Sequence, residues 1–222
     1  MSQQTIPLEE LAERYNKIYT PAIADILDER GLMHQILPPS IQALAPGMRI
    51  AGPALTAKGT PTTIHKDEYL QPMLQVYMTL EPGVVAVYDS SADQMAAHWG
   101  ELVSTAASVK GCRGAVIDGG VRDVDRIIEM GFPVFCRYRS PADIRGRWRY
   151  VDVNVPIRLG DVLVQPGDYV VGDANGVVIV PKDLTVEVLL AVEEVVEIED
   201  KIRAELRAGE NPMTLYQKYR RF

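Results

Sequence analysis

The side chains best suited to chemistry lie in two short segments, residues 100–103 (Gly-Glu-Leu-Val) and 118–123 (Asp-Gly-Gly-Val-Arg-Asp). In the second segment, the Arg122 guanidinium offers a planar fork of donors for a carboxylate or a keto oxygen. Asp123 beside it and Glu101 in the first segment are hard oxygen ligands, and proteins commonly hold Mg²⁺ with one or two carboxylates plus waters. The two segments therefore predict a site for a small anion together with a divalent cation.

Each of these residues also has an ordinary structural explanation. An acid in the first turn of a helix commonly complements the helix dipole, which would account for Asp123 or Glu101 alone. Arg122 could form a surface ion pair, and the two glycines before it would suit any sharp turn. Their joint placement favours a binding site, because Gly100 stands at a predicted helix start where free N–H groups attract anions.

Alternating strands and helices must position these two segments. We expect strands at residues 84–88, 114–117 and 133–135, with helices at 99–109 and 121–130 between them. This alternation indicates βαβ units with parallel strands. Ligands bind at the carboxyl ends of such strands, so both segments should meet at one edge of the sheet.

The flanking regions predict helices at both ends of the chain and a β-rich section between. Two N-terminal helices should cover about 8–19 and 20–31, with Thr20 as the N-cap of the second and Gly31 as its stop. Short strands separated by Gly-Asp and Asn-Gly turns follow residue 149, and a long helix should run over about 183–208. The predicted fold is α/β, one domain over 1–222, whose terminal helices pack on it or on a neighbouring subunit.

One acid in the predicted C-terminal helix stands out from its neighbours. Apolar residues recur there with a 4-3 spacing, at Val188, Val192, Val195, Ile202 and Leu206. Glu199 occupies the missing position of that stripe. A carboxylate among core-facing positions needs a partner or an ion, or it must reach solvent. Glu199 is therefore a further candidate ligand, with partial exposure as the alternative.

Composition excludes several classes of protein. The 222 residues carry a formal net charge of −7, whereas nucleic-acid binders usually show a basic excess. No signal peptide or bilayer-spanning apolar run is visible, so we expect a cytoplasmic protein that binds neither nucleic acid nor membrane. His34, His65 and His98 lack a zinc-ligand spacing, although His98 lies next to the predicted site. Lys58, on a predicted strand, leaves a Schiff-base mechanism open.

Four blocks of this sequence resemble the RraA-like family. They are Gly100-Glu101-Leu102, residues 114–125 (Gly-Ala-Val-Ile-Asp-Gly-Gly-Val-Arg-Asp-Val-Asp), 131–135 (Gly-Phe-Pro-Val-Phe) and 172–181 (Gly-Asp-Ala-Asn-Gly-Val-Val-Ile-Val-Pro). The family contains the regulator of ribonuclease E activity A and the class II 4-hydroxy-4-methyl-2-oxoglutarate aldolases. The resemblance covers about 20–209, and it implies a swivelling β/β/α fold assembled as homotrimers or hexamers.

Within that family, the residues favour the aldolase branch. The aldolases carry an Arg-Asp pair matched by Arg122-Asp123, whereas the regulators lack this Asp. The resemblance implies that Asp123 binds Mg²⁺ or Mn²⁺, that Glu101 holds it through water, and that Glu199 of a neighbouring subunit does the same. It also implies that Arg122 binds the keto oxygen of the substrate.

The resemblance thus implies a metal-dependent lyase that cleaves a 4-hydroxy-2-oxo (di)carboxylic acid, such as 4-hydroxy-4-methyl-2-oxoglutarate, to pyruvate. The backbone amides of Gly100, Glu101, Leu102 and Val103 would hold the substrate carboxylate. Oxaloacetate decarboxylation is expected as a second activity, because it passes through the same enolate. Three alternatives stay open: a lysine Schiff-base aldolase, a non-catalytic regulator that binds an RNA-processing enzyme, and an enzyme that catalyses another enolate reaction on a related substrate.

Overall fold

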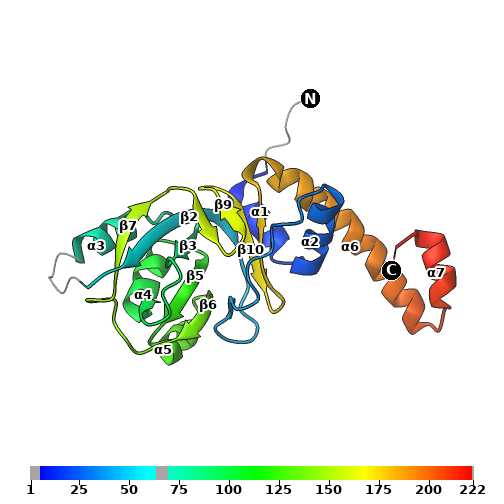
Figure 1. The fold of residues 1–222 in the computed structure, drawn as a ribbon. Helices are drawn as coiled ribbons and strands as arrows, with labels where there is room; N and C mark the ends of the chain where they lie inside the picture. Colours follow the sequence, from blue (N-terminus) through cyan, green and yellow to red (C-terminus); the bar gives the residue numbers. More distant parts are fainter. Residues whose placement is uncertain (1–5, 64–69, 222) are drawn as a thin grey trace.

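The computed structural model describes residues 6–63 and 70–221, in which nine strands form one mixed sheet and two more form a hairpin (Figure 1). Hydrogen-bonded neighbours follow the order β1-β6-β5-β3-β2-β10-β11, while β4 pairs with β5 and β7 with β2. The strands of this sheet are β1 (Gln42–Ala43), β2 (Ile50–Pro61), β3 (Val85–Asp89), β4 (Ala97–Trp99), β5 (Gly114–Val121), β6 (Val134–Arg139), β7 (Trp148–Val153), β10 (Tyr169–Asp173) and β11 (Gly176–Val180).

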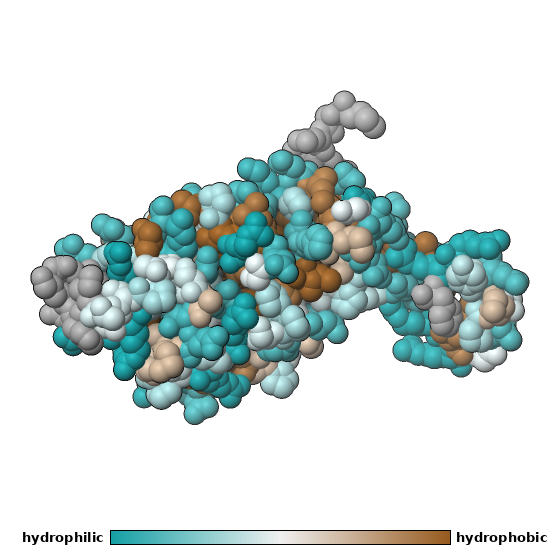
Figure 2. All heavy atoms as spheres, in the orientation of Figure 1, coloured by the Kyte–Doolittle hydropathy of each residue, from teal (hydrophilic) through white to brown (hydrophobic). Residues whose placement is uncertain are grey.

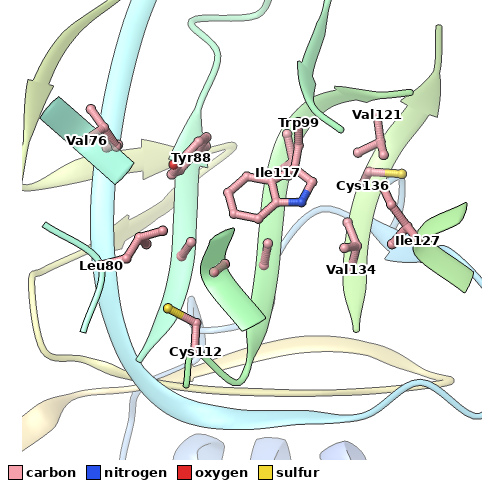
Figure 3. Close-up of a cluster of buried hydrophobic side chains, with 14 of the residues drawn as sticks. Val76, Leu80, Tyr88, Trp99, Cys112, Ile117, Val121, Ile127, Val134 and Cys136 are labelled. Atoms are coloured by element: carbon pink, nitrogen blue, oxygen red, sulfur yellow. The ribbon is translucent and has the colours of Figure 1, made fainter. Parts of the chain in front are cut away.

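The parallel part of the sheet confirms the predicted βαβ units. β2, β3, β5 and β6 run parallel, with Asp89 at the end of β3 opposite Asp118 in β5. Helices α3 (Leu70–Met78), α4 (Glu101–Val109) and α5 (Val124–Glu129) pack against one face of these strands. Figure 3 shows the core between them, where Trp99 lies among Tyr88, Ile117 and Val134. The carboxyl ends of β4 and β5 therefore lead into the first turns of α4 and α5.

The β-rich half is also confirmed. β10 and β11 form an antiparallel hairpin, and β10 pairs antiparallel with β2, which joins this half to the parallel strands. The separate hairpin of β8 (Ile157–Leu159) and β9 (Val162–Val164) lies over the face of the sheet opposite α3 and α4. Its Leu159 and Val164 are fully buried with Val87 and Phe135 of the parallel strands. Both faces of the central strands are thus covered.

The terminal helices pack on one another. One core joins β10 and β11 to three helices: α1 (Leu8–Tyr15), α2 (Thr20–Glu29) and the first half of α6 (Thr185–Arg207). A short 3₁₀ turn, η2 (Lys182–Leu184), leads into α6. Beyond this core, the far end of α6 leaves the body as an arm, and α7 (Pro212–Tyr219) folds back on it (Figures 1 and 2). The long C-terminal helix is confirmed. No helix in the described ranges is both long and apolar enough to cross a membrane.

Three local predictions were wrong. The first helix ends at Tyr15 instead of Tyr19. Thr20 is not the N-cap of α2; its N–H and hydroxyl both donate to the buried Asp173 carboxylate, at 2.9 and 2.8 Å, so an acid distant in sequence supplies the cap. The strand predicted to end at residue 117 continues through Gly119-Gly120 to Val121, with a register shift against β6, so α5 begins at Val124 instead of residue 121.

Candidate active site

The two predicted segments meet through a side-chain contact to the backbone. Gly100 is the N-cap residue of α4, and Arg122 and Asp123 lie between β5 and α5. The Asp123 carboxylate accepts a hydrogen bond from the Glu101 N–H, at 3.2 Å. Asp123 has a φ of 56°, in the left-handed region that Asp tolerates better than most residues. The predicted proximity of these residues is present in the structure.

Gly100 is required by the packing as well as by the helix start. A Cβ on Gly100 would lie 2.8 Å from Asp123 Oδ2 and 3.1 Å from Arg122 Cγ. Its backbone is extended, with a φ of −159°, so the constraint is space and not conformation. The absence of a side chain lets the Arg122 and Asp123 side chains rest directly on the first turn of α4.

Arg122 lies between two carboxylates. Its Nη1 donates to Asp143 Oδ2 at 2.7 Å, and its Nε lies 3.6 Å from Asp123 Oδ2. Asp143 was missed from the sequence, although it is the sole acid in the arginine-rich stretch 137–149. That isolation was the available signal. The ion pair with Asp143 fixes the direction of the guanidinium at the mouth of a cavity.

This cavity has a volume of about 400 Å³ and lies between α3, α4 and the loop before β7. Arg122, Asp123 and Asp143 line it together with Gly100, Leu102 and Val103, as well as apolar side chains of α3. Asp118, the first residue of the second segment, does not line it. Asp118 is buried and pairs with Arg137, and burial raises its pKa while Arg137 opposes that rise. Lys58 is also absent from the described lining.

His98, a buried residue of β4 in the cavity lining, supports the end of β5. Its Nδ1 accepts a hydrogen bond from the Gly120 N–H at 3.1 Å, and its Nε2 lies 3.1 Å from Asp93 Oδ2. A Cβ on Gly119 would lie 2.4 Å from His98 Nδ1, so this glycine allows the imidazole to approach the strand. Burial lowers the pKa of His98 to about 4, against a smaller opposing effect of Asp93. His98 is therefore neutral near pH 7.

The buried imidazole makes stability depend on pH. Between pH 6.5 and 4 the unfolded chain gains a proton on His98 that the folded chain does not bind, so the free energy of unfolding falls as the pH falls through this window. The expected loss from this residue is about 3 kcal/mol. Urea unfolding at a series of pH values measures this loss. The free energy of unfolding of His98→Gln should fall less steeply with falling pH than that of the unmodified protein. His34→Gln, at an exposed position, should keep the pH dependence of the unmodified protein.

The three carboxylates predicted as metal ligands do not lie together within a single chain. Glu101 Oε1 accepts from the Thr105 hydroxyl at 2.8 Å, one turn along α4. Glu199 lies on α6, where it pairs with Arg203 at 2.8 Å and does not line the cavity; it is partly exposed, as the alternative reading allowed. In the part of the chain that the structure describes, no three His, Cys, Asp or Glu residues are grouped to hold a metal ion. His65 lies outside the described residues.

The donors present still suit a hard cation. The Asp123 side chain is 42% exposed at the cavity, and the Glu101 carboxylate accepts a hydrogen bond from the Thr105 hydroxyl. One carboxylate with waters, aided by a second, is a common way to hold Mg²⁺, whereas zinc would need a denser cluster. The residues of a single chain therefore fit Mg²⁺ or Mn²⁺, which keep several water ligands, better than a metal such as zinc that is bound by protein side chains on all sides.

Comparison with known proteins decides the family. Residues 20–179 match the family model described as RraA-like, Aldolase/RraA. The chain belongs to the RraA-like family. This RraA-like protein is 34% identical over 182 residues to a Halalkalibacterium halodurans protein named "Putative 4-hydroxy-4-methyl-2-oxoglutarate aldolase", covering 82% of this chain and 80% of that one. It is 40% identical to an uncharacterized protein of Methanocaldococcus jannaschii over 52% of this chain, an alignment that spans 55% of that protein.

A solved structure shows the same fold. The RraA-like protein superposes on RraAS2 of Streptomyces coelicolor with a TM-score of 0.79 and 27% identity, over 90% of this chain and 98% of that one. RraAS2 is described as an unusual member of the RNase ES inhibitor RraA family. The relatives thus include both an aldolase name and an inhibitor name, and the choice between them depends on the residues of the site.

Proposed function

We propose that this RraA-like protein is a divalent-metal-dependent aldolase that cleaves a 4-hydroxy-2-oxo acid to pyruvate. The observation that carries the proposal is the Arg122–Asp123 pair, which lies against the N-terminus of α4 at the mouth of a cavity. The aldolase name of the Halalkalibacterium halodurans relative supports the same reaction class. The proposal includes oxaloacetate decarboxylation, assembly as a homotrimer or hexamer, and 4-hydroxy-4-methyl-2-oxoglutarate as one candidate substrate.

The pyruvyl end of the substrate would bind where anion donors converge. The first N–H groups of α4 would hold its carboxylate, chiefly those of Gly100, Leu102 and Val103, because the Glu101 N–H already donates to Asp123. The Arg122 guanidinium, directed by Asp143, would donate to the keto oxygen. When the C3–C4 bond breaks, its electrons form a pyruvate enolate whose negative oxygen remains beside this guanidinium. A donor already aimed at the developing charge lowers the barrier to cleavage.

The same carboxylates would serve the cation and the protons. Asp123 would hold Mg²⁺ or Mn²⁺, with Glu101 and the Glu199 of a second copy acting through waters. When bound, the cation supplies Lewis-acid polarisation of the 2-oxo acid. The C4 hydroxyl loses its proton as its oxygen becomes a carbonyl, and C3 of the enolate gains one. We assign Glu101, at the start of α4, to move this proton through a water.

An assay of pyruvate release tests the proposal against the Schiff-base and regulator alternatives. We expect release from oxaloacetate and from 4-hydroxy-4-methyl-2-oxoglutarate, abolished by a chelator and restored by Mg²⁺. Activity that survives the chelator, with borohydride trapping of substrate on Lys58, would instead establish a Schiff-base enzyme. A stoichiometric complex with an RNA-processing ribonuclease, together with no release from either substrate, would establish the regulator that the likeness to RraAS2 suggests.

A further inference from the structure

One buried side chain joins the two segments of the candidate site. His98 lies in β4, two residues before Gly100, the N-cap residue of α4. Its Nδ1 accepts a hydrogen bond from the Gly120 N–H at 3.1 Å, and Gly120 lies in β5, two residues before Arg122. His98 is therefore linked through the backbone to the start of α4 and through its imidazole to the strand that leads to Arg122.

The backbone pairing at this place is irregular. β4 pairs with β5 at Ala97–Gly120 and Trp99–Val121, with a register shift between the two pairs. β5 also shifts register against β6 in the residues before Gly120. Ladder hydrogen bonds are disrupted at such irregularities, so a side chain that bonds the strand there contributes more to its position than it would in a regular sheet.

A backbone hydrogen bond holds the same strand end at a second point. The Arg122 N–H donates to the Trp99 carbonyl oxygen at 3.0 Å, and Trp99 directly follows His98. The bond to the imidazole lies two residues earlier, and the Arg122 guanidinium extends beyond both points. Loss of the imidazole bond would let the strand end rotate and displace the guanidinium. A displacement of about 1 Å in an active site can lower the rate on the order of 10²-fold.

Asp93 selects the tautomer of the imidazole. His98 is neutral near pH 7, because burial lowers its pKa to about 4. A neutral imidazole that accepts at Nδ1 carries its proton on Nε2, which lies 3.1 Å from Asp93 Oδ2. This carboxylate is itself fixed, since its Oδ2 accepts from the Ala96 N–H at 2.8 Å. A fixed negative charge beside Nε2 favours the tautomer that leaves Nδ1 free to accept from Gly120.

The Asp93–His98 pair lies inside one chain. The His98 side chain is fully buried, and the Asp93 side chain is 9% exposed. The Trp148 ring packs edge-on against the imidazole, with the ring centroids 4.8 Å apart. The contacts of the imidazole with Asp93, Gly120 and Trp148 are all present in the single chain. They therefore do not depend on groups that a second copy adds to the cavity.

We propose that Asp93 and His98 are positioning residues for the reaction: Asp93 holds His98 in the tautomer that accepts from Gly120, and His98 fixes the end of β5 so that Arg122 meets the keto oxygen. This inference rests on the proposed function and deepens it. A displaced guanidinium should stabilise the enolate oxygen less, because the negative charge on that oxygen develops in the transition state. Loss of the pair should therefore lower kcat much more than it raises KM.

Two neutral amides separate the hydrogen bond from the volume of the side chain. The amide of His98→Asn takes the position of Nδ1, and its oxygen can accept from the Gly120 N–H, whereas the longer side chain of His98→Gln places its amide near Nε2. For pyruvate release from oxaloacetate with Mg²⁺, we expect His98→Gln to lower kcat about tenfold or more and His98→Asn less than about threefold. KM should change less than about threefold in both, because the N–H groups of α4 still hold the substrate carboxylate. A role in filling space predicts the reverse order of kcat, since Gln is closer to His in volume.

Asp93→Asn tests the tautomer without changing the imidazole. Its oxygen can still accept from the Ala96 N–H, but the negative charge beside Nε2 is lost, and its NH₂ group can donate to Nε2. In ¹⁵N NMR spectra, where the His98 signals are identified by their loss in His98→Asn, we expect the Nε2–H tautomer in unmodified protein and a shift toward Nδ1–H in Asp93→Asn. kcat should fall about tenfold, with KM within about threefold. Asp161→Asn, an exposed acid in the turn between β8 and β9, is the matched control and should change neither the tautomer nor kcat.

These measurements separate failure of the inference from failure of the proposed function. Protonation of His98 on Nδ1 in unmodified protein near pH 7 would overturn the inference whatever the activity. Equal losses of kcat in His98→Asn and His98→Gln, both measured below the onset of thermal unfolding, would overturn it and leave the aldolase in place. Full kcat in Asp93→Asn despite a shifted tautomer would do the same, and this test remains if a His98 variant does not fold. Absence of pyruvate release by unmodified protein, with the Nε2–H tautomer observed, would overturn the proposed function and the positioning role with it.

Discussion

Replacing Arg122 with alanine is expected to lower kcat for pyruvate release by on the order of 10²-fold or more. The guanidinium is the one described cation at the cavity, and Asp143 holds it in place at 2.7 Å. Its loss removes a donor from the enolate oxygen and leaves Asp123 and Asp143 without their counter-charge. Both carboxylates are partly exposed, so water can solvate them and the fold should survive.

The size of this effect is measurable against matched variants. Arg126→Ala removes an exposed arginine one turn along α5 and should leave kcat unchanged. Arg122→Lys keeps the charge but loses the planar fork, so we expect partial recovery of kcat. Asp143→Asn weakens the ion pair without touching the proposed keto site, and its effect should fall between those of the unmodified protein and Arg122→Ala. A nearly active Arg122→Ala enzyme would refute the role assigned to this residue.

The central sheet was predictable because its signals are local. Short apolar strands followed by helices and glycine stops can be read from nearby residues, and β3 and α4 lie within two residues of the predicted bounds. β5 begins where it was predicted but runs four residues past its predicted end. The errors arose where a distant residue decides the structure. Nothing near Thr20 shows that Asp173 caps α2, since the cap depends on the packing of the β10–β11 hairpin against that helix. α7 had a readable signal, Asn211 followed by Pro212, which was overlooked.

The candidate site divides in the same way. Gly100, Glu101 and the Arg122–Asp123 pair were predictable because each stands at a junction between a strand and a helix. Asp143 contacts Arg122 from 21 residues away in sequence, and His98 contacts Gly120 from 22 residues away. The spacing of residues in the sequence does not predict such contacts. The cavity could not be predicted either, because it requires the relative placement of α3 and α4. That Glu199 of a neighbouring subunit lies near Asp123 stays a prediction, because it concerns a contact between two chains.

Asp123→Asn should be the most damaging conservative change in the site, lowering kcat by on the order of 10²- to 10³-fold. Asn is nearly the same size and tolerates the φ of 56° at this position. Its amide oxygen can still accept from the Glu101 N–H, so the junction between β5 and α4 should persist. What the variant loses is one negative charge and an anionic oxygen ligand. An effect of this size would therefore come from the carboxylate itself and not from the shape of the turn.

Metal binding separates that interpretation from a role for Asp123 in orienting Arg122. Calorimetric titration with Mn²⁺ should give saturable binding to the unmodified protein and none, or at least tenfold weaker binding, to Asp123→Asn. Asp125→Asn removes an exposed acid from the first turn of α5 and should bind Mn²⁺ as the unmodified protein does. If Asp123→Asn lost activity but kept full Mn²⁺ affinity, Asp123 would act through its 3.6 Å contact with Arg122. The cation would then need other ligands, and Glu101 with the Glu199 of a second copy would be the next pair to vary.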